Sequence, residues 1–256
     1  MNPALRRLKE RVASRPADPV ARAELCAALA GTPEGPRCLS QARDLIQNSL
    51  RLGAWDLALQ ASEILWAALD DPDWAVLAAE AALLTGDVDG GRGRLEALAA
   101  QFPALPAPRT RLGALALAAG DAAAALRWIE PLATANTETR ALYAHALLAA
   151  GRPAEAVEFA SVSCAALPHE AELQLVVGLA HLADDHPGRA VTAFSEALRL
   201  DPTRQEVHYN LAVAFALEGS IPAAVGVVDA ALAARPTDAR LLALRADLLE
   251  RLRQAR

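Results

Sequence analysis

The hydrophobic positions of this chain recur at helical spacing, in pairs of stripes separated by a turn. Residues 171–202 show this best: small and large apolar residues spaced by three and four form one stripe through Val177 and Gly178, and a second through Ala190 and Phe194. Residues at this spacing cover one face of an amphipathic helix. The segment therefore predicts two helices packed against each other across a turn.

The same pattern occurs again 34 residues later, in residues 205–236. Small residues fall on small, large on large and proline on proline, so that Gly178 coincides with Ala212. A fixed period of this length indicates a solenoid, in which each repeat buries its apolar face against its neighbours. Gly178 and Ala190 should lie at the tightest helix crossing, because only small side chains let two backbones approach closely.

This pattern resembles the tetratricopeptide repeat, a helix–turn–helix unit of about 34 residues. The signature of that family requires small, small, aromatic, small and proline residues. The matching positions are Gly178, Ala190, Phe194, Ala197 and Pro202. The resemblance implies an all-α fold, a right-handed solenoid of antiparallel helix pairs, and covers nearly all of residues 39–256. It also implies that the first helix of each pair lines a concave groove in which partners bind.

The period divides the chain into three expected parts. Residues 1–38 match it loosely and should form atypical capping helices, the first with Leu5, Leu8 and Val12 on one face and the second starting at Asp18. Residues 39–236 should hold six repeats, with bounds at 39–71, 72–105, 106–136, 137–170, 171–204 and 205–236. Turn glycines, with Asp185 in the fifth repeat, should end the first helices in left-handed conformation.

Residues 237–256 should form one C-terminal capping helix. Its expected inner stripe holds Leu242, Arg245, Ala246 and Leu249, and its arginines, including Arg256, face solvent. A polar outer face is what a terminal repeat needs, because no further repeat covers it.

Composition supports helices and excludes several classes of function. Hydrophobic residues make up 54% of the chain and aromatic residues only 4%, an alanine- and leucine-rich balance that favours closely packed helices. The net charge of −6 gives no reason to expect a nucleic-acid partner. No stretch has the uninterrupted apolar length of a membrane span.

The three cysteines, Cys26, Cys38 and Cys164, are odd in number and form no CxxC pair. We expect buried thiols in a reducing compartment. The N-terminal residues carry positive charge without a following apolar run, which is not the pattern of a secretory signal. The expected location is the cytoplasm.

Catalytic and cofactor motifs are not found in the sequence. The segment GDVDGGRG, beginning at Gly86, is similar to a phosphate or calcium loop but lacks the residues that would complete either. His181, His186 and the acids Asp184 and Asp185 are close in sequence, but helical spacing separates them. No metal, no cofactor and no enzymatic activity are expected.

The remaining candidate is the groove surface implied by the family resemblance. Its expected partner-binding positions on the first helices are His145, Leu175, Leu179, Tyr209, Asn210 and Val213. Most are apolar, whereas a solvated groove normally carries polar side chains. The alternative is that a neighbouring helix or a second copy of the chain buries them.

Three acids also repeat with the period: Glu138, Glu172 and Glu206. An acid in the first turn of a helix complements the helix dipole, which is reason enough for such a pattern. A second interpretation is an acidic ladder along one rim that faces a basic partner.

These observations predict a non-catalytic adaptor or scaffold in a bacterial-type assembly, binding a peptide or helix of a partner protein. Two alternatives stay open. One is a homo-oligomeric scaffold whose groove binds its own N-terminal helix or another copy; the other is an accessory subunit of an unrecognised enzyme complex.

Overall fold

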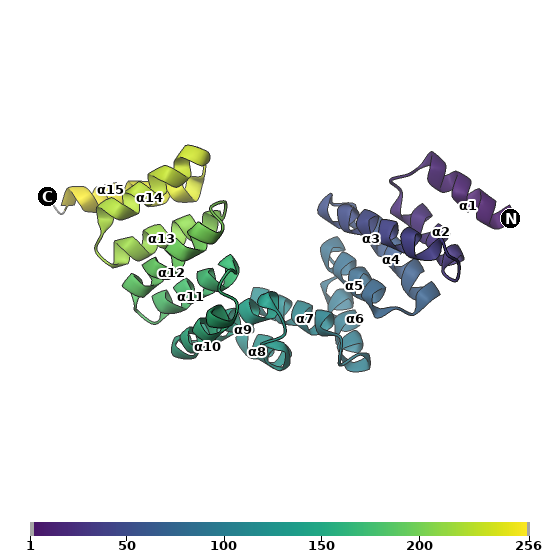
Figure 1. Ribbon diagram of the computed structural model, residues 1–256, viewed down its shortest axis with the longest axis horizontal. Coiled ribbons are helices and arrows are strands. Elements are labelled where there is room, and N and C mark those ends of the chain that lie inside the picture. The colour runs from purple at the N-terminus through teal and green to yellow at the C-terminus, as the bar shows by residue number, and fades with distance from the viewer. Residues whose placement is uncertain (1–2, 255–256) are drawn as a thin grey trace. The chain divides into compact units, whose positions relative to one another are not determined.

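The chain is all-α. The computed structural model describes residues 3–254, and in this part of the chain helices alternate with short turns and no strand occurs (Figure 1). The arrangement is a helical solenoid, which confirms the predicted fold class. The chain divides into two compact units, residues 1–112 and 113–256, and helix α7 contributes to both.

In its described residues, the first unit contains six complete helices and the start of a seventh. They are α1 (Pro3–Ser14), α2 (Pro19–Leu29), α3 (Gly35–Arg51), α4 (Trp55–Leu69), α5 (Pro72–Thr85), α6 (Val88–Gln101) and α7 (Pro106–Ala118). The Asp18 carboxylate accepts hydrogen bonds from the backbone N–H groups of Val20 and Ala21, both at 3.0 Å, as expected for the N-cap of α2. Val12 is buried, with Leu5 and Leu8 packed around it.

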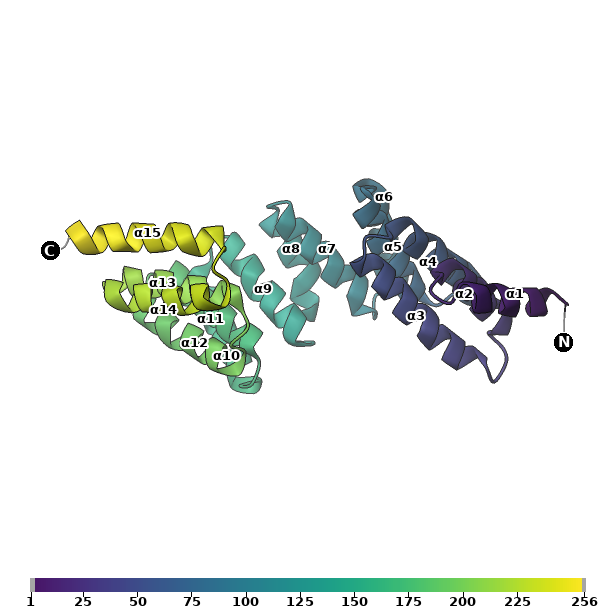
Figure 2. The same cartoon turned by 90° about the horizontal axis from the view of Figure 1, so that it is seen from above.

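The second unit continues from α7 through eight further α-helices in its described residues. They are α8 (Ala122–Ile129), α9 (Thr137–Ala149), α10 (Pro153–Ala166), α11 (Ala171–Ala183), α12 (Pro187–Leu200), α13 (Gln205–Leu217), α14 (Ile221–Ala234) and α15 (Ala239–Gln254), with a short 3-10 turn, Glu130–Leu132, after α8. Both views of the chain show α15 lying beside α14 (Figure 2).

Turn chemistry follows the sequence pattern. The five expected turn glycines, among them Gly53 and Gly219, have positive φ, and Asp185 occupies the corresponding place with φ 57°. An aspartate tolerates this conformation better than most residues do. The glycine-rich segment after Gly86 is the start of α6, where the Asp87 carboxylate accepts a hydrogen bond from Gly90 N–H at 3.0 Å.

The predicted crossing at Gly178 is present, and a phenylalanine makes it tight. A Cβ atom on Gly178 would overlap the ring of Phe194 from α12. Ala190, also on α12, is fully buried. The glycine therefore makes room for an aromatic ring, and both residues belong to the signature that identified the repeat.

The buried stripe of the C-terminal helix is shifted by one residue from the predicted stripe. Leu241 and Leu248 are the buried residues of α15 and Leu244 packs beside them, whereas Leu242 is 45% exposed. The Asp238 carboxylate accepts hydrogen bonds from the backbone of Arg240 and Leu241 and sets where the helix begins. The predicted inner stripe was therefore wrong, because packing against α14 decides which face of α15 is covered. Residues 255 and 256 lie outside the described residues.

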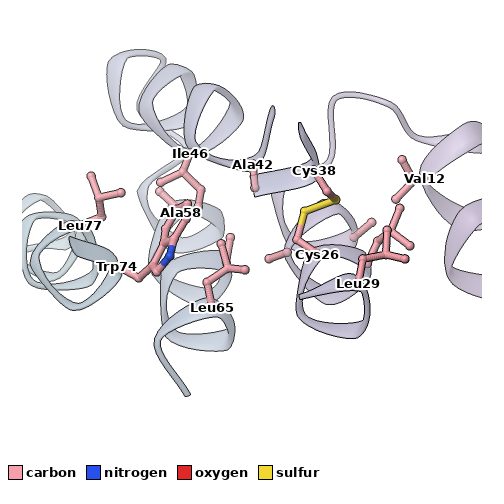
Figure 3. Close-up of a cluster of buried hydrophobic side chains, with 14 of the residues drawn as sticks. Val12, Cys26, Leu29, Cys38, Ala42, Ile46, Ala58, Leu65, Trp74 and Leu77 are labelled. Carbon is pink, nitrogen blue, oxygen red and sulfur yellow. A yellow bond between two sulfur atoms is a disulfide. The ribbon is translucent and has the colours of Figure 1, made fainter. Parts of the chain in front are cut away.

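The structure also contradicts the prediction that all three cysteines are free thiols. Cys26 of α2 and Cys38 of α3 form a disulfide inside the core of the first unit, and only Cys164 remains a buried free thiol (Figure 3). The prediction of three buried thiols was wrong for two of them, because α2 and α3 place residues 12 positions apart side by side. The expected reducing compartment loses its main support.

Candidate partner-binding surfaces

Leucine 175, predicted to line the groove, lies in the core of the second unit. It is 5% exposed and shares a cluster with Val207 and Leu211 of α13. Leu179, one turn further along α11, packs against the edge of the same cluster. Leu175 is therefore a packing residue between α11 and α13 and does not line an open groove, because neighbouring first helices close over it.

Tyrosine 209 and its neighbours on α13 are half-buried. The guanidinium of Arg240, from α15, lies over the Tyr209 ring at 4.6 Å from the ring centroid. An arginine over an aromatic face is attracted by the ring's electron density. Asn210 and Val213 are partly exposed on the same helix. Tyr209, Asn210 and Val213 thus keep part of their side chains accessible on one helix, with the Arg240 charge beside the Tyr209 ring.

Histidine 145 connects this surface to the predicted acids. Burial lowers the pKa of His145, and the negative charges of Glu172 and Glu206 act in the opposite direction. The structure thus brings together an imidazole from α9 and carboxylates from the first turns of α11 and α13. We call His145, Leu179, Tyr209, Asn210 and Val213 the α9–α13 face.

The acidic ladder is bridged by an arginine that sequence reasoning missed. Arg204, directly before α13, pairs with Glu172 and lies 3.3 Å from a carboxylate oxygen of Glu206. A carboxylate oxygen of Asp201 is also 3.4 Å away. Glu138 lies in the first turn of α9. One positive charge thus offsets part of the negative charge of three carboxylates, and these contacts with Arg204 favour the structural interpretation of Glu172 and Glu206.

A groove in the first unit was not predicted. It has a volume of about 450 Å³ and is lined by α3, α5 and the part of α7 that belongs to this unit. Three polar side chains follow one face of α3 at spacings of four: Arg43, Gln47 and Arg51. We call this the α3–α5–α7 groove. The sequence indicated this groove only through that polar stripe. The stripe is hard to recognise in a sequence, because most solvent-exposed positions of a long helix are also polar.

Charged pairs stand over an apolar floor in this groove. Arg43 bonds Asp73 at 3.2 Å and stacks on the Trp74 ring at 4.9 Å from its centroid. The floor is formed by Val76 and Leu77, which are nearly buried.

Farther along the α3–α5–α7 groove, Arg111 bonds Glu80 at 2.5 Å. Gln47 and Arg51 are exposed, and no carboxylate among residues 3–254 pairs with Arg51. The groove thus combines a place for an apolar side chain with an arginine available to an anionic group.

Part of this chain is similar in sequence to a known family. The tetratricopeptide repeat family model matches residues 176–239, which span α11 to α14. The resemblance to the tetratricopeptide repeat predicted from the sequence is thus confirmed for this segment. None of the curated proteins matches its sequence.

Several solved structures have a similar fold at low sequence identity. A tetratricopeptide repeat protein from Parabacteroides merdae is 12% identical with a TM-score of 0.65, the alignment covering 96% of this chain and 98% of that one. PilW, a type IV pilus biogenesis factor, is 14% identical with a TM-score of 0.68, over 78% of this chain and 95% of that one. A chain of the APC/C Cut9–Hcn1 hetero-tetramer is 13% identical with a TM-score of 0.67, over 96% of this chain and 46% of that one.

Side chains that could bind a metal or act as nucleophiles are dispersed or buried in the described residues. In residues 3–254 no three histidine, cysteine or acidic side chains are grouped so that they could hold a metal ion. Burial raises the pKa of the Cys164 thiol to about 11, which keeps it protonated. No helix in the described part of the chain has both the length and the apolar character that a bilayer span requires. The two surfaces described above are therefore the features to be explained.

Proposed function

We propose that this tetratricopeptide protein is a non-catalytic adaptor or scaffold that binds a segment of a partner protein. The tetratricopeptide fold generally mediates protein–protein interaction. The observation that carries the proposal is the α3–α5–α7 groove, where an apolar floor at Val76 and Leu77 lies beside the unpaired Arg51. A surface of this kind suits a segment that has one apolar anchor and an adjacent acidic side chain.

The charged pairs of the groove are suited to recognition. Arg43 is held by both Asp73 and the Trp74 ring, so its position is set before a partner arrives. Pre-positioned side chains lose less entropy on binding. Gln47 offers a donor and an acceptor to the backbone of a bound segment.

The α9–α13 face is proposed as a second contact surface. Leu179, Tyr209 and Val213 keep part of their apolar area accessible above the buried Leu175. His145 and Asn210 provide polar contacts beside them, and Glu138, Glu172 and Glu206 form its acidic edge. This face supports an amphipathic helix better than an extended segment, because its apolar residues come from two helices, α11 and α13.

The test is a comparative affinity capture with mass spectrometry in the native host. The groove variant combines Gln47→Glu with Arg51→Glu, both exposed positions, so that the fold is kept while the charge is reversed. The matched control is Arg92→Glu, an exposed arginine of α6 outside the groove. Recovery of a groove-bound partner should fall by about tenfold or more in the groove variant, because like charges then oppose it, and stay at the wild-type level in the control.

The α9–α13 face and the two alternative functions are tested with further samples prepared in the same way. Val213→Glu should remove a partner of the α9–α13 face and leave the circular dichroism spectrum unchanged. A partner recovered equally with all variants would contradict both surfaces. Light scattering across a concentration series identifies the self-assembling alternative, since its mass would rise with concentration. Co-purification of an enzyme whose activity depends on this chain would identify the accessory-subunit alternative.

A further inference from the structure

The disulfide lies where few reagents could reach it. Cys26 is fully buried and Cys38 is 5% exposed, and both belong to the core cluster that also contains Val12 and Leu29. Figure 3 shows the two sulfur atoms between α2 and α3, inside this cluster. The bond is therefore part of the hydrophobic core of the first unit.

The bond ties α2 to α3 near the N-terminal end of that unit. Residues 26 and 38 enclose the turn between α2 and α3, which is otherwise held by contacts such as the hydrogen bond from Thr32 Oγ1 to the Leu29 carbonyl at 2.8 Å. The Lys9–Glu34 ion pair is exposed to solvent and contributes little. A terminal part of a solenoid has a neighbour on one side only. A cross-link removes conformational freedom from its unfolded state.

We propose that Cys26–Cys38 is a permanent structural disulfide, made while the chain folds, and that this protein consequently folds in an oxidising compartment and not in the cytoplasm. In forming it, the two thiols release two protons and pass two electrons to the disulfide of an external thiol–disulfide oxidant, through a mixed disulfide, and the oxidant leaves as a dithiol. That exchange must precede completion of the core, because the folded unit encloses both sulfur atoms. Thiol pools in the cytoplasm keep such cysteines reduced.

Cys164 makes the test internally controlled. It is buried and free, so it should resist alkylation in the folded chain and react fully once the chain is unfolded. Cells of the native host are treated with an alkylating agent during lysis, and the intact full-length protein is weighed by mass spectrometry in three states.

The folded protein should carry no adduct, the unfolded unreduced protein one and the unfolded reduced protein three. Peptide mapping should place the single adduct on Cys164. Three adducts without reduction would overturn the proposal, as would a cross-link that involves Cys164.

A stability measurement tests the structural role separately. The variant Cys26→Ala combined with Cys38→Ala should melt on the order of 10 °C below the wild type, because it loses the cross-link. Cys164→Ala is the matched control, since it removes a buried cysteine of the other unit and keeps the disulfide. Wild-type protein incubated with a thiol reductant should keep its disulfide when folded and lose it in denaturant. Rapid reduction of the folded protein would contradict a buried permanent bond.

Discussion

At the scale of single residues, some helical glycines are required because a neighbouring side chain occupies the space that a Cβ atom would need. The Phe194 ring occupies the space that a Cβ on Gly178 would need. Gly226, in α14, has no heavy atom within 4 Å of its would-be Cβ. The two glycines therefore have opposite roles, although both lie inside helices.

Alanine substitution separates these roles. Gly178→Ala should lower the free energy of unfolding by about 1–3 kcal/mol, because Phe194 must move. Gly226→Ala should raise it by about 0.4–1 kcal/mol, because the unfolded chain loses conformational freedom and nothing is displaced. Chemical denaturation of both variants measures the difference. Equal effects at the two positions would show that the crossing at Gly178 is misplaced.

A partly buried imidazole makes stability depend on pH. The pKa of His145 is lowered from 6.5 in the folded chain, chiefly by burial and against the charges of Glu172 and Glu206. The folded state therefore prefers the neutral ring. Its stabilising contribution is complete above pH 6.5 and is lost as the pH falls through the lower folded pKa.

Denaturation of the wild type at about pH 7.5 and about pH 5 should show this loss, because histidine titrates in that range. His145→Gln, which stays neutral throughout, should lose less stability on acidification. A His145→Gln variant with the wild-type pH dependence would mean that protonation of His145 does not limit stability in acid.

At the scale of elements, the stability contributed by a terminal helix depends on which of its faces packs against the neighbouring helix. The buried residues of α15 are Leu241 and Leu248, and their neighbour Leu242 is 45% exposed. The two ends also differ in how they are secured. The N-terminal helices have a disulfide between α2 and α3, whereas α15 is held by apolar packing on α14 and by an ion pair from Arg245 to Asp229 at 2.5 Å.

Adjacent leucines test the rotation of α15. Leu241→Ala should cost about 2–5 kcal/mol of unfolding free energy, because it empties a buried site. Leu242→Ala should change it by less than about 0.5 kcal/mol, as at other surface positions. Thermal melts of the two variants provide the comparison. The reverse order would restore the stripe predicted from the sequence.

At the scale of the whole molecule, the two units differ in how their charged side chains are arranged. The α3–α5–α7 groove in residues 1–112 presents three arginines against two carboxylates. The acids Glu172 and Glu206 of the second unit share Arg204. The net charge of −6 therefore describes neither surface.

The sequence by itself determined the helical content, the repeat period and the turn positions. These follow from local rules: apolar spacing sets the helix face, glycine or aspartate ends a helix, and Asp18 caps the next one. Gly178, Ala190 and Phe194 were sufficient to indicate both the crossing and the repeat pattern of this segment. Each of these features depends on residues close together in the chain or on their repetition at a fixed distance.

The tertiary structure alone decided which apolar residues are covered and which polar residues meet. Leu175 and Leu179 have the same helical face in the sequence, but packing of α13 buries Leu175. Packing likewise joined Cys26 to Cys38 and placed Arg51 beside Val76 and Leu77 in a groove. These outcomes depend on how far one helix is rotated and shifted against the next. That geometry results from many weak contacts between distant residues, which no local pattern encodes.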